Sequence, residues 1–366
     1  MSQLIDNYYL SLGEVMFAFG FLVGIKVVFG YVMSAVLKIL RDEPAQADNR
    51  ENKPEQRVAA SAQDLQNFGR HTLWVGLAGI WLYSGVIQIL PMMVVVAKDR
   101  YVNSVISYDP GFVTTCIQWF SNYWFFDPTA ANILSVLVQF SLALLLYLGR
   151  EHFVGKIGLW VSMGLAFLDW VVGESFGRLF AISHDSVSGF PGAALLVMFL
   201  SILLLLPRKW WEKGRALRFG SRVLGGLFLL VALSQLVHMG GRSSSMHLTG
   251  QVVSSSLTPE FIFLSHIWLI RTFEYHSEWI SVALFLIFAL GAYVSVRALE
   301  RRVLVYFLIV FLLFVWWMIE SFGVAPHYLL NIGMVPGFVI VLWAFHRTKQ
   351  HANKYKKGVT ADGYDK

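Results

Sequence analysis

Charged residues are scarce in this chain: Asp, Glu, Lys and Arg together account for 14% of its 366 residues. A typical soluble domain carries about 25% charged residues. Hydrophobic residues supply 56% of the chain, and the mean hydropathy is +0.59. These values exclude an ordinary soluble globular protein and predict an integral membrane protein.

Cysteine is almost absent, with Cys116 as the single residue of its kind. One cysteine can form neither an internal disulfide nor a Cys-x-x-Cys relay, so the chain has no thiol redox chemistry of its own. None of the ten histidines stands in a His-x-His or His-x-x-x-His pattern, so no metal site is predicted. A haem would need two histidines at similar depth, and only His238 and His266 approach that arrangement. Six histidines are expected on the external side: His184, His238, His247, His266, His276 and His327.

Long apolar runs, in contrast, are plentiful. A bilayer core of about 30 Å is crossed by roughly 20 helical residues. Nine runs are long enough, which predicts an all-α, multi-pass protein with nine transmembrane helices. The runs lie at about 10–30, 73–96, 129–148, 157–176, 188–206, 220–239, 279–297, 303–323 and 328–346. No Lys or Arg precedes the first run and no small-residue cleavage site follows it, so we expect a retained helix rather than a signal peptide.

The basic residues sort by loop. With the N-terminus outside, 22 Lys and Arg residues fall in cytoplasmic segments and five in external ones. This bias predicts an N-out, C-in topology in a plasma membrane of the bacterial or archaeal type. The net charge of +6 then follows from topology and from attraction to anionic lipid, so no nucleic acid partner is expected.

The sequence also contains an internal duplication. The stretches "LDWVVGESFGRLF" and "VWWMIESFGVAP" share the pattern Trp-x-x-x-Glu-Ser-Phe-Gly, in which Glu174 matches Glu320. Pro191-Gly192 is matched with Pro336-Gly337 at nearly the same offset. Because each block holds four spans, both copies face the same way, and we expect two parallel four-helix repeats after one N-terminal helix.

These features divide the chain into six segments. They are an N-terminal transmembrane helix (1–40), a polar cytoplasmic linker with room for a short surface helix (41–70), the first repeat (71–207), a basic cytoplasmic loop (208–222), the second repeat (219–346) and a basic cytoplasmic tail (347–366). Two long external loops, 97–128 and 240–278, are rich in aromatic residues. They are expected to form an interfacial belt or in-plane helices, or else a docking surface for a lipidic or protein partner.

Two acidic residues are expected near the external interface. Glu174 and Glu320 each follow the last basic residue of a cytoplasmic turn by 18 residues, which is about 27 Å along a helix. A carboxylate at that level can be held by the positive N-terminus of the next helix, and this role explains why the feature occurs twice. Alternatively, the two serve as external carboxylates that accept protons or a cation.

Asp169 breaks the symmetry of the repeats, because Val315 stands in its place in the second copy. It lies 13 residues above Lys156, about 20 Å along the helix and nearly 10 Å inside the outer boundary. Three more polar positions of the first block become apolar in the second: Tyr83 becomes Leu230, Ser84 becomes Val231 and Gln139 becomes Leu286.

Tyr83 and Gln139 are expected at a depth similar to that of Asp169, so these side chains and Ser84 can form one polar site. Intramembrane ionisable groups usually face a bundle interior or cavity, which makes the cluster a functional candidate. Ser84 and Gln88 are its candidate cofactor-binding residues. The alternative is a hydrogen-bonded staple that ties three helices together.

The stretches "GLAGIWLYSGVIQILPMM", "ILSVLVQFSLALLLYLGR" and "GLWVSMGLAFLDWVVGESFG" resemble the four-helix DoxX-like membrane module over residues 73–206, and residues 220–346 resemble it more weakly. That group is similar to the membrane subunit of thiosulfate:quinone oxidoreductase. The resemblance implies a redox-associated membrane subunit, and it transfers no catalytic residue to this chain.

We therefore expect a membrane subunit of a redox-associated complex, with quinone as its candidate cofactor. In this scheme Tyr83, Gln139 and Asp169 would bond the quinone oxygens or relay protons, and Glu174 would conduct protons to the outer face. An extracytoplasmic or membrane partner subunit would dock on the long external loops. A small-solute or proton-coupled transporter is the first alternative, and a structural or assembly subunit is the second.

Overall fold

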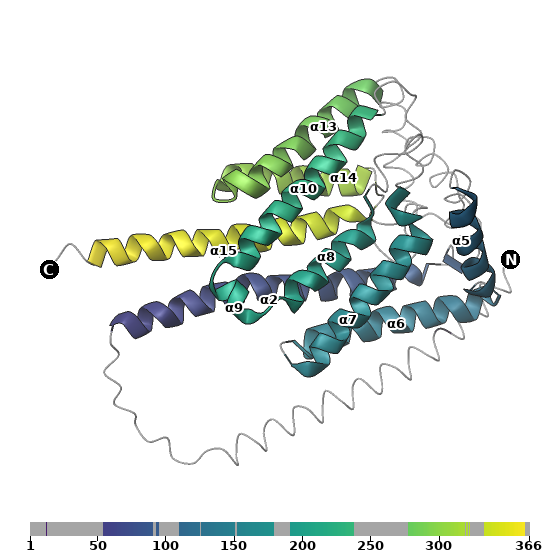
Figure 1. Cartoon of the computed structure of the whole chain (residues 1–366), viewed down its shortest axis with the longest axis horizontal. Helices are drawn as coiled ribbons and strands as arrows, with labels where there is room; N and C mark the ends of the chain where they lie inside the picture. The colour runs from purple at the N-terminus through teal and green to yellow at the C-terminus, as the bar shows by residue number, and fades with distance from the viewer. Residues whose placement is uncertain are drawn as a thin grey trace, which may run out of the picture. The chain divides into compact units, whose positions relative to one another are not determined.

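The computed structural model describes Leu12 and residues 54–90, 93–94, 110–124, 126–150, 152–178, 191–237, 277–318, 320, 322 and 333–362. Every regular element among these residues is helical. The chain divides into two compact units, Met1–Ser61 and Ala62–Lys366. All contacts discussed below lie within the second unit, whose helices are labelled in Figure 1.

The helices follow one another with short connections where the structure describes them. In chain order they are α2 (Pro54–Gln88), α5 (Gly111–Trp124), α6 (Pro128–Leu148), α7 (Phe153–Leu168), the π-helical η2 (Asp169–Gly173), the 3₁₀ turn η3 (Phe176–Arg178), α8 (Ala193–Leu205), α9 (Arg208–Glu212), α10 (Arg215–Val237), α13 (Ser277–Tyr293), the π-helical η4 (Val294–Ala298), α14 (Arg302–Met318) and α15 (Met334–Asp362).

Four of the described segments are long and apolar enough to cross a membrane. They are Pro128–Leu148, Phe153–Gly173, Arg215–Gln235 and Ser281–Ala298. Two more apolar helices, Ala193–Leu205 and Arg302–Trp317, are shorter. The all-α architecture expected from the apolar runs is confirmed for the described residues. The first expected span, 10–30, lies outside them apart from Leu12.

The part of the polar linker that the structure describes, from Pro54 on, and the apolar run that follows it belong to one helix, α2, of 35 residues. The sequence from Pro54 to Thr72 contains Ala, Gln, Glu, Arg and Leu, which are good helix formers, and it has a single glycine, Gly69. Nothing in it stops the helix before the apolar run begins. At the other end of the chain, α15 likewise continues from its apolar half into the basic tail.

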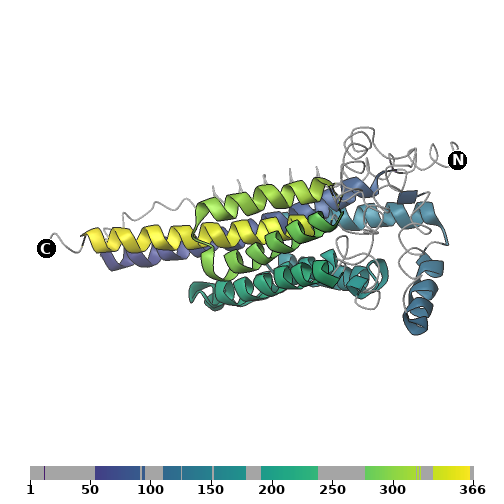
Figure 2. The same cartoon turned by 90° about the horizontal axis from the view of Figure 1, so that it is seen from above.

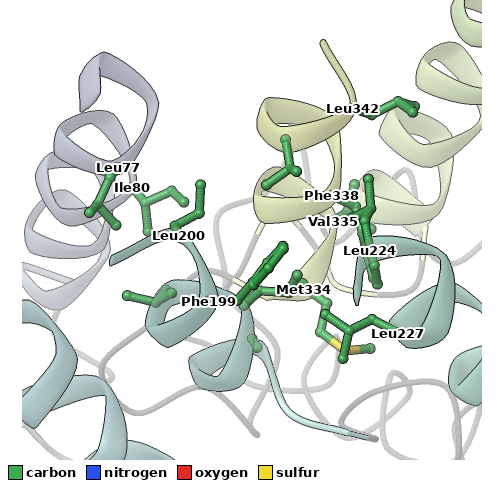
Figure 3. Close-up of a cluster of buried hydrophobic side chains, with 14 of the residues drawn as sticks. Leu77, Ile80, Phe199, Leu200, Leu224, Leu227, Met334, Val335, Phe338 and Leu342 are labelled. Atoms are coloured by element: carbon green, nitrogen blue, oxygen red, sulfur yellow. The ribbon is translucent and has the colours of Figure 1, made fainter. Parts of the chain in front are cut away.

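Helix α8 is the centre of the core. Nine of its 13 residues are buried, and it packs against α7 on one side and α15 on another. Figure 3 shows Phe199 and Leu200 of this helix between Leu77 and Ile80 of α2 and the side chains of Met334, Val335 and Phe338 of α15. Leu224 and Leu227 of α10 close the cluster from the far side. A helix of about 20 Å is therefore surrounded by protein on most of its surface.

Helices α2 and α15 run antiparallel and very close together. A Cβ atom on Gly76 would collide with Ile340, and one on Gly69 would collide with Thr348. From Ala62 onward the two helices lie side by side in both views of the molecule (Figures 1 and 2). The missing side chains of these glycines let the two backbones approach, as small residues do at helix interfaces in membranes.

Candidate functional site

The carboxylate of Glu174 caps the N-terminus of α8. Its Oε1 accepts the backbone N–H of Ala193 at 2.9 Å and of Ala194 at 3.1 Å. The first turn of a helix leaves such N–H groups without intrahelical partners, and its positive dipole end favours a negative charge. The buried Glu174 thus satisfies a helix end that its own N-cap residue, Gly192, cannot satisfy with a side chain.

Glu320 does the same for α15. Its Oε1 accepts the N–H of Met334 at 2.9 Å, and its Oε2 accepts the N–H of Val335 at 3.2 Å. It is also buried. We therefore assign both glutamates to the helix-capping role, because hydrogen bonds to helix ends hold the oxygens that an external proton acceptor would need to present to solvent.

A glycine in the left-handed region precedes each capped helix. Gly192 has φ 110° and Gly333 has φ 92°. A Cβ atom at either position would collide with the carboxylate of the capping glutamate, Glu174 or Glu320 respectively. Both the backbone angle and the close approach therefore require glycine at these two positions.

The sequence pairing of Pro191-Gly192 with Pro336-Gly337 is corrected by this geometry. The counterpart of Gly192 is Gly333, and Pro336 is instead the third residue of α15, where a missing N–H is tolerated. Gly337 packs against Leu196 of α8. The dipeptide match was misleading because the segment from the glutamate to the glycine is 18 residues long in the first copy and 13 in the second.

The rest of the repeated motif is also alike in both copies. The ring of Trp170 meets Phe176 edge-on at 5.4 Å and 79°, and Trp316 meets Phe322 at 5.3 Å and 84°. Both phenylalanines have φ 56°, an uncommon angle for a residue with a side chain. The glutamate N–H bonds the carbonyl five residues earlier in each copy, at 2.9 and 3.4 Å. Each copy of the motif, from Trp170 to Phe176 and from Trp316 to Phe322, thus ends one helix and caps the next. We call the two copies the clasps.

Asp169 lies at the start of the π-helical turn η2 and is buried, with 3% of its surface exposed. π-Helical turns are rare and are frequent at functional sites. The side chain lines a recess whose walls come from three helices, namely Ile80, Trp81 and Ser84 of α2, Ala166 of α7, and Ala194 and Val197 of α8. Of the candidate site residues, the structure therefore brings Asp169 and Ser84 together.

The recess is narrow. Its empty volume is about 200 Å³ when the space open to solvent is included, but no part of it is wide enough for a water molecule. Ser84 is buried, and its Oγ has no hydrogen-bond partner among the described residues. A quinone ring does not fit this space as it stands.

A chain of hydrogen bonds that the sequence did not reveal lies beside the recess. Trp81 Nε1 donates to Ser162 Oγ at 2.8 Å, and Ser162 Oγ lies 3.1 Å from Ser201 Oγ. Ser201 Oγ donates its own proton to the carbonyl of Val197 at 2.9 Å. Ser162 must therefore be the donor to Ser201, and every proton in the chain is used. This staple ties α2, α7 and α8 together.

The positions that match the staple in the second copy are apolar. By the same offset, Phe228 stands for Trp81 and Leu308 for Ser162, and both are fully buried. The signal that singled out Asp169, a polar residue replaced by an apolar one in the sister copy, also marks these two residues. Extending that comparison along each helix would have found the staple.

Tyr83 points to a different place. Its hydroxyl donates to the carbonyl of Phe322 at 3.1 Å, and its ring lies 5.6 Å from that of Trp316. It therefore contacts the second copy of the clasp and does not line the recess of Asp169. Tyr83 is separated from Ser84 and Asp169 of the expected cluster because neighbouring residues on α2, here Tyr83 and Ser84, project about 100° apart.

Gln139 on α6 is 1% exposed, and neither atom of its amide has a hydrogen-bond partner among the described residues. The next residue, Phe140, would touch a Cβ placed on Gly85 of α2, so Gln139 lies at about the level of Ser84. It does not line the recess itself. Gln88 pairs with Asn132: its Nε2 donates to Asn132 Oδ1 at 2.5 Å, and Asn132 Nδ2 donates back to the Gln88 carbonyl at 2.8 Å.

No group of three or more His, Cys, Asp or Glu residues that could hold a metal ion occurs in the described part of the chain. The six histidines expected on the external side lie outside the described residues. The first of the two long loops expected outside, 97–128, is described in part. There α5 buries Val113 and Ile117 and exposes Trp119 and Tyr123, whose rings stack at 6.4 Å and 11°.

Comparison with known proteins does not show which family the chain belongs to. No family model, no curated protein and no solved structure matches the chain. The resemblance to the DoxX-like module stays a prediction.

Proposed function

We propose that the protein is a multi-pass plasma membrane protein that couples its activity to proton transfer, with Asp169 as the group that binds and releases the proton. The observation that carries this proposal is the recess at Asp169, which is buried between three helices. A carboxyl group can hold a proton there as a neutral acid, which avoids the large cost of burying a charge. Ser84 lines the same recess and is a candidate to exchange a hydrogen bond with it.

The width of the recess favours a proton over a larger substrate. A proton can reach and leave a carboxyl group through transient waters and hydroxyl groups, whereas an organic solute needs a cavity of its own size. Transfer requires the recess to open on one side at a time. The hydrogen-bonded staple and the two clasps are well placed to keep the surrounding helices in register while that happens.

We further propose the finer topology: nine spans, N-out and C-in, with two parallel repeats. The two clasps support the duplication, since they share a cap, an aromatic pair and an unusual backbone angle. In this arrangement the second repeat lies beside the first and carries apolar residues at the positions of its polar ones. Asp169 lies in the outer half of the membrane.

The test is proton flux in proteoliposomes. The purified protein is reconstituted with a pH-sensitive dye inside, and a pH gradient is imposed with and without a membrane potential. Asp169→Asn should reduce protein-dependent flux at least tenfold, while Glu212→Gln, an exposed acid on α9, should leave it unchanged. Equal flux in Asp169→Asn and the native protein, with both correctly folded, would refute the proposal.

A second candidate is the redox-associated subunit that interacts with a quinone. One observation favours it: Tyr83, Trp316 and Phe322 form an aromatic group that is partly exposed at the protein surface. Such rings can stack on a quinone that arrives from the lipid, without using the narrow recess. Quenching of tryptophan fluorescence by a soluble quinone should saturate and should be lost in Trp316→Leu. Quenching that rises linearly without saturation would exclude this binding.

A further inference from the structure

The loop between the two repeats, which contains α9, is held in a fixed position by a buried side chain. Helix α9 is anchored by Trp211, which is buried and donates its indole N–H to the carbonyl of Leu203 at 3.2 Å. The neighbouring Trp210 faces outward and is 40% exposed. Figure 1 shows α9 as the short turn that joins the end of α8 to the start of α10. The anchor therefore holds the exposed basic residues of α9 in place.

The first two turns of α10 continue this surface as a stripe. Arg215, Arg218, Phe219 and Arg222 are spaced i, i+3, i+4 and i+7, which places them on one face of a helix. All four are exposed. The opposite face is buried, with Gly220 packed tightly against Phe345. The helix cannot rotate these arginines away from solvent without breaking that contact.

The charge of this surface is not neutralised within the described part of the protein. Six basic residues and one acid lie between Arg208 and Arg222, and the acid, Glu212, is 3.7 Å from Arg208. The remaining five form no ion pair with a described residue: Lys209, Lys213, Arg215, Arg218 and Arg222. The surface has a strong preference for a negatively charged partner.

We propose that α9 and the arginine stripe of α10 bind the headgroups of anionic phospholipids. Arg215 begins one of the apolar helices that are long enough to cross a membrane, so the stripe lies at the level where lipid phosphates are found. Guanidinium groups bind phosphate oxygens in pairs. Trp210 and Phe219, exposed among the cations, suit the boundary between headgroups and acyl chains.

The shape of the surface favours lipid over a small anion. The three arginines extend over about 10 Å of helix instead of converging on one point, which fits several headgroups side by side. The inference depends on membrane insertion of α10 and not on proton transfer at Asp169, so the two proposals can fail separately.

The experiment measures lipid binding by the intact protein in a zwitterionic detergent. Mixed micelles of phosphatidylglycerol or phosphatidylcholine are titrated, and binding is followed by the shift in thermal unfolding and by native mass spectrometry. The native protein should bind phosphatidylglycerol preferentially. The variant Arg215→Gln/Arg218→Gln/Arg222→Gln should bind it on the order of ten- to a hundredfold more weakly, given the attraction expected per basic residue.

The matched control is Arg297→Gln/Arg301→Gln/Arg302→Gln, which removes the same charge from three exposed arginines that do not share a helix face. It should keep its affinity within about threefold. Equal losses in both triple variants, or no loss in the stripe variant, would overturn the proposal. So would stabilisation by inorganic phosphate that matches that by phosphatidylglycerol.

A second variant protects the test against misfolding. Lys209→Gln/Lys213→Gln leaves α10 and its packing untouched and removes two exposed charges, one in α9 and one at its C-terminal cap. Its affinity for phosphatidylglycerol should fall by a smaller factor than that of the stripe variant. An unchanged affinity here would show that α9 takes no part, which contradicts the surface as proposed.

Discussion

The carboxylate of Glu174 accepts the backbone N–H of Ala193 at 2.9 Å, across a connection that leads from the end of η2 to the start of α8. The same relationship, at the same distance, joins Glu320 to Met334. Each glutamate thus closes the turn in which it lies by capping the helix that follows.

Removing the charge of either clasp should destabilise the protein by a similar amount. In Glu174→Gln and Glu320→Gln, a neutral amide replaces a carboxylate that accepts at least two helix N–H groups. A loss of about 1–3 kcal/mol in unfolding free energy is expected for each, because bonds to charged groups are strong and the helix dipole favours an anion. Denaturant unfolding in detergent measures this, with Glu212→Gln as the exposed control. A silent Glu320→Gln would contradict the equivalence of the two clasps.

Substitution of glycine by alanine should lower stability at the clasps and raise it at ordinary helix positions. Gly192→Ala and Gly333→Ala add a Cβ that meets the capping carboxylate, at a backbone angle unsuited to L residues, so each should cost about 1–3 kcal/mol. Gly79→Ala and Gly226→Ala place the same methyl group where no atom lies within 4 Å, inside a helix. These two should stabilise the protein by up to about 1 kcal/mol. The prediction is wrong if the two pairs shift the unfolding midpoint in the same direction.

The staple beside the recess should behave as one coupled unit. Ser162→Ala leaves the buried indole N–H of Trp81 without a partner, which should cost about 1–3 kcal/mol. Trp81→Phe removes the donor as well, so in the double variant the loss should be less than the sum of the single losses. A double-mutant cycle gives this coupling directly. Additive losses would mean that the hydrogen bond contributes nothing to stability.

Gln139→Leu should increase stability and decrease proton flux. The native amide is buried with no hydrogen-bond partner among the described residues, and a leucine of similar volume removes the cost of desolvating it. The expected gain is about 1–2 kcal/mol. If Gln139 takes part in proton transfer near Asp169, flux in proteoliposomes should fall by severalfold in the same variant. A leucine variant that loses stability would show that the amide is satisfied in the membrane.

Several features could be predicted from the sequence because they depend on local properties of the chain. The all-α character of the described residues follows from the length of the apolar runs. The capping alternative for Glu174 and Glu320 also required only the order acid, turn, helix. The burial of Asp169, Gln139 and Ser84 agrees with their place in apolar segments.

Other features depend on how the helices are turned and spaced against one another, which no local pattern contains. The rotation of α2 sends Tyr83 to Phe322 and Ser84 to Asp169, although the two residues are adjacent in the chain. The length of the turn before α15 makes Gly333 and not Gly337 the partner of the second clasp. The good helix formers after Pro54 join the polar linker to the second apolar run, which begins near residue 73, a continuity hidden by the change in composition.

The sequence by itself therefore determined which segments are helical and apolar, and which polar residues fall inside the apolar segments. Only the tertiary structure decided which of those residues meet. The physical reason is that burial is set by the composition of a segment, whereas a hydrogen bond requires two atoms within about 3 Å. That distance depends on the packing of whole helices, which glycines such as Gly69 and Gly76 control from far along the chain.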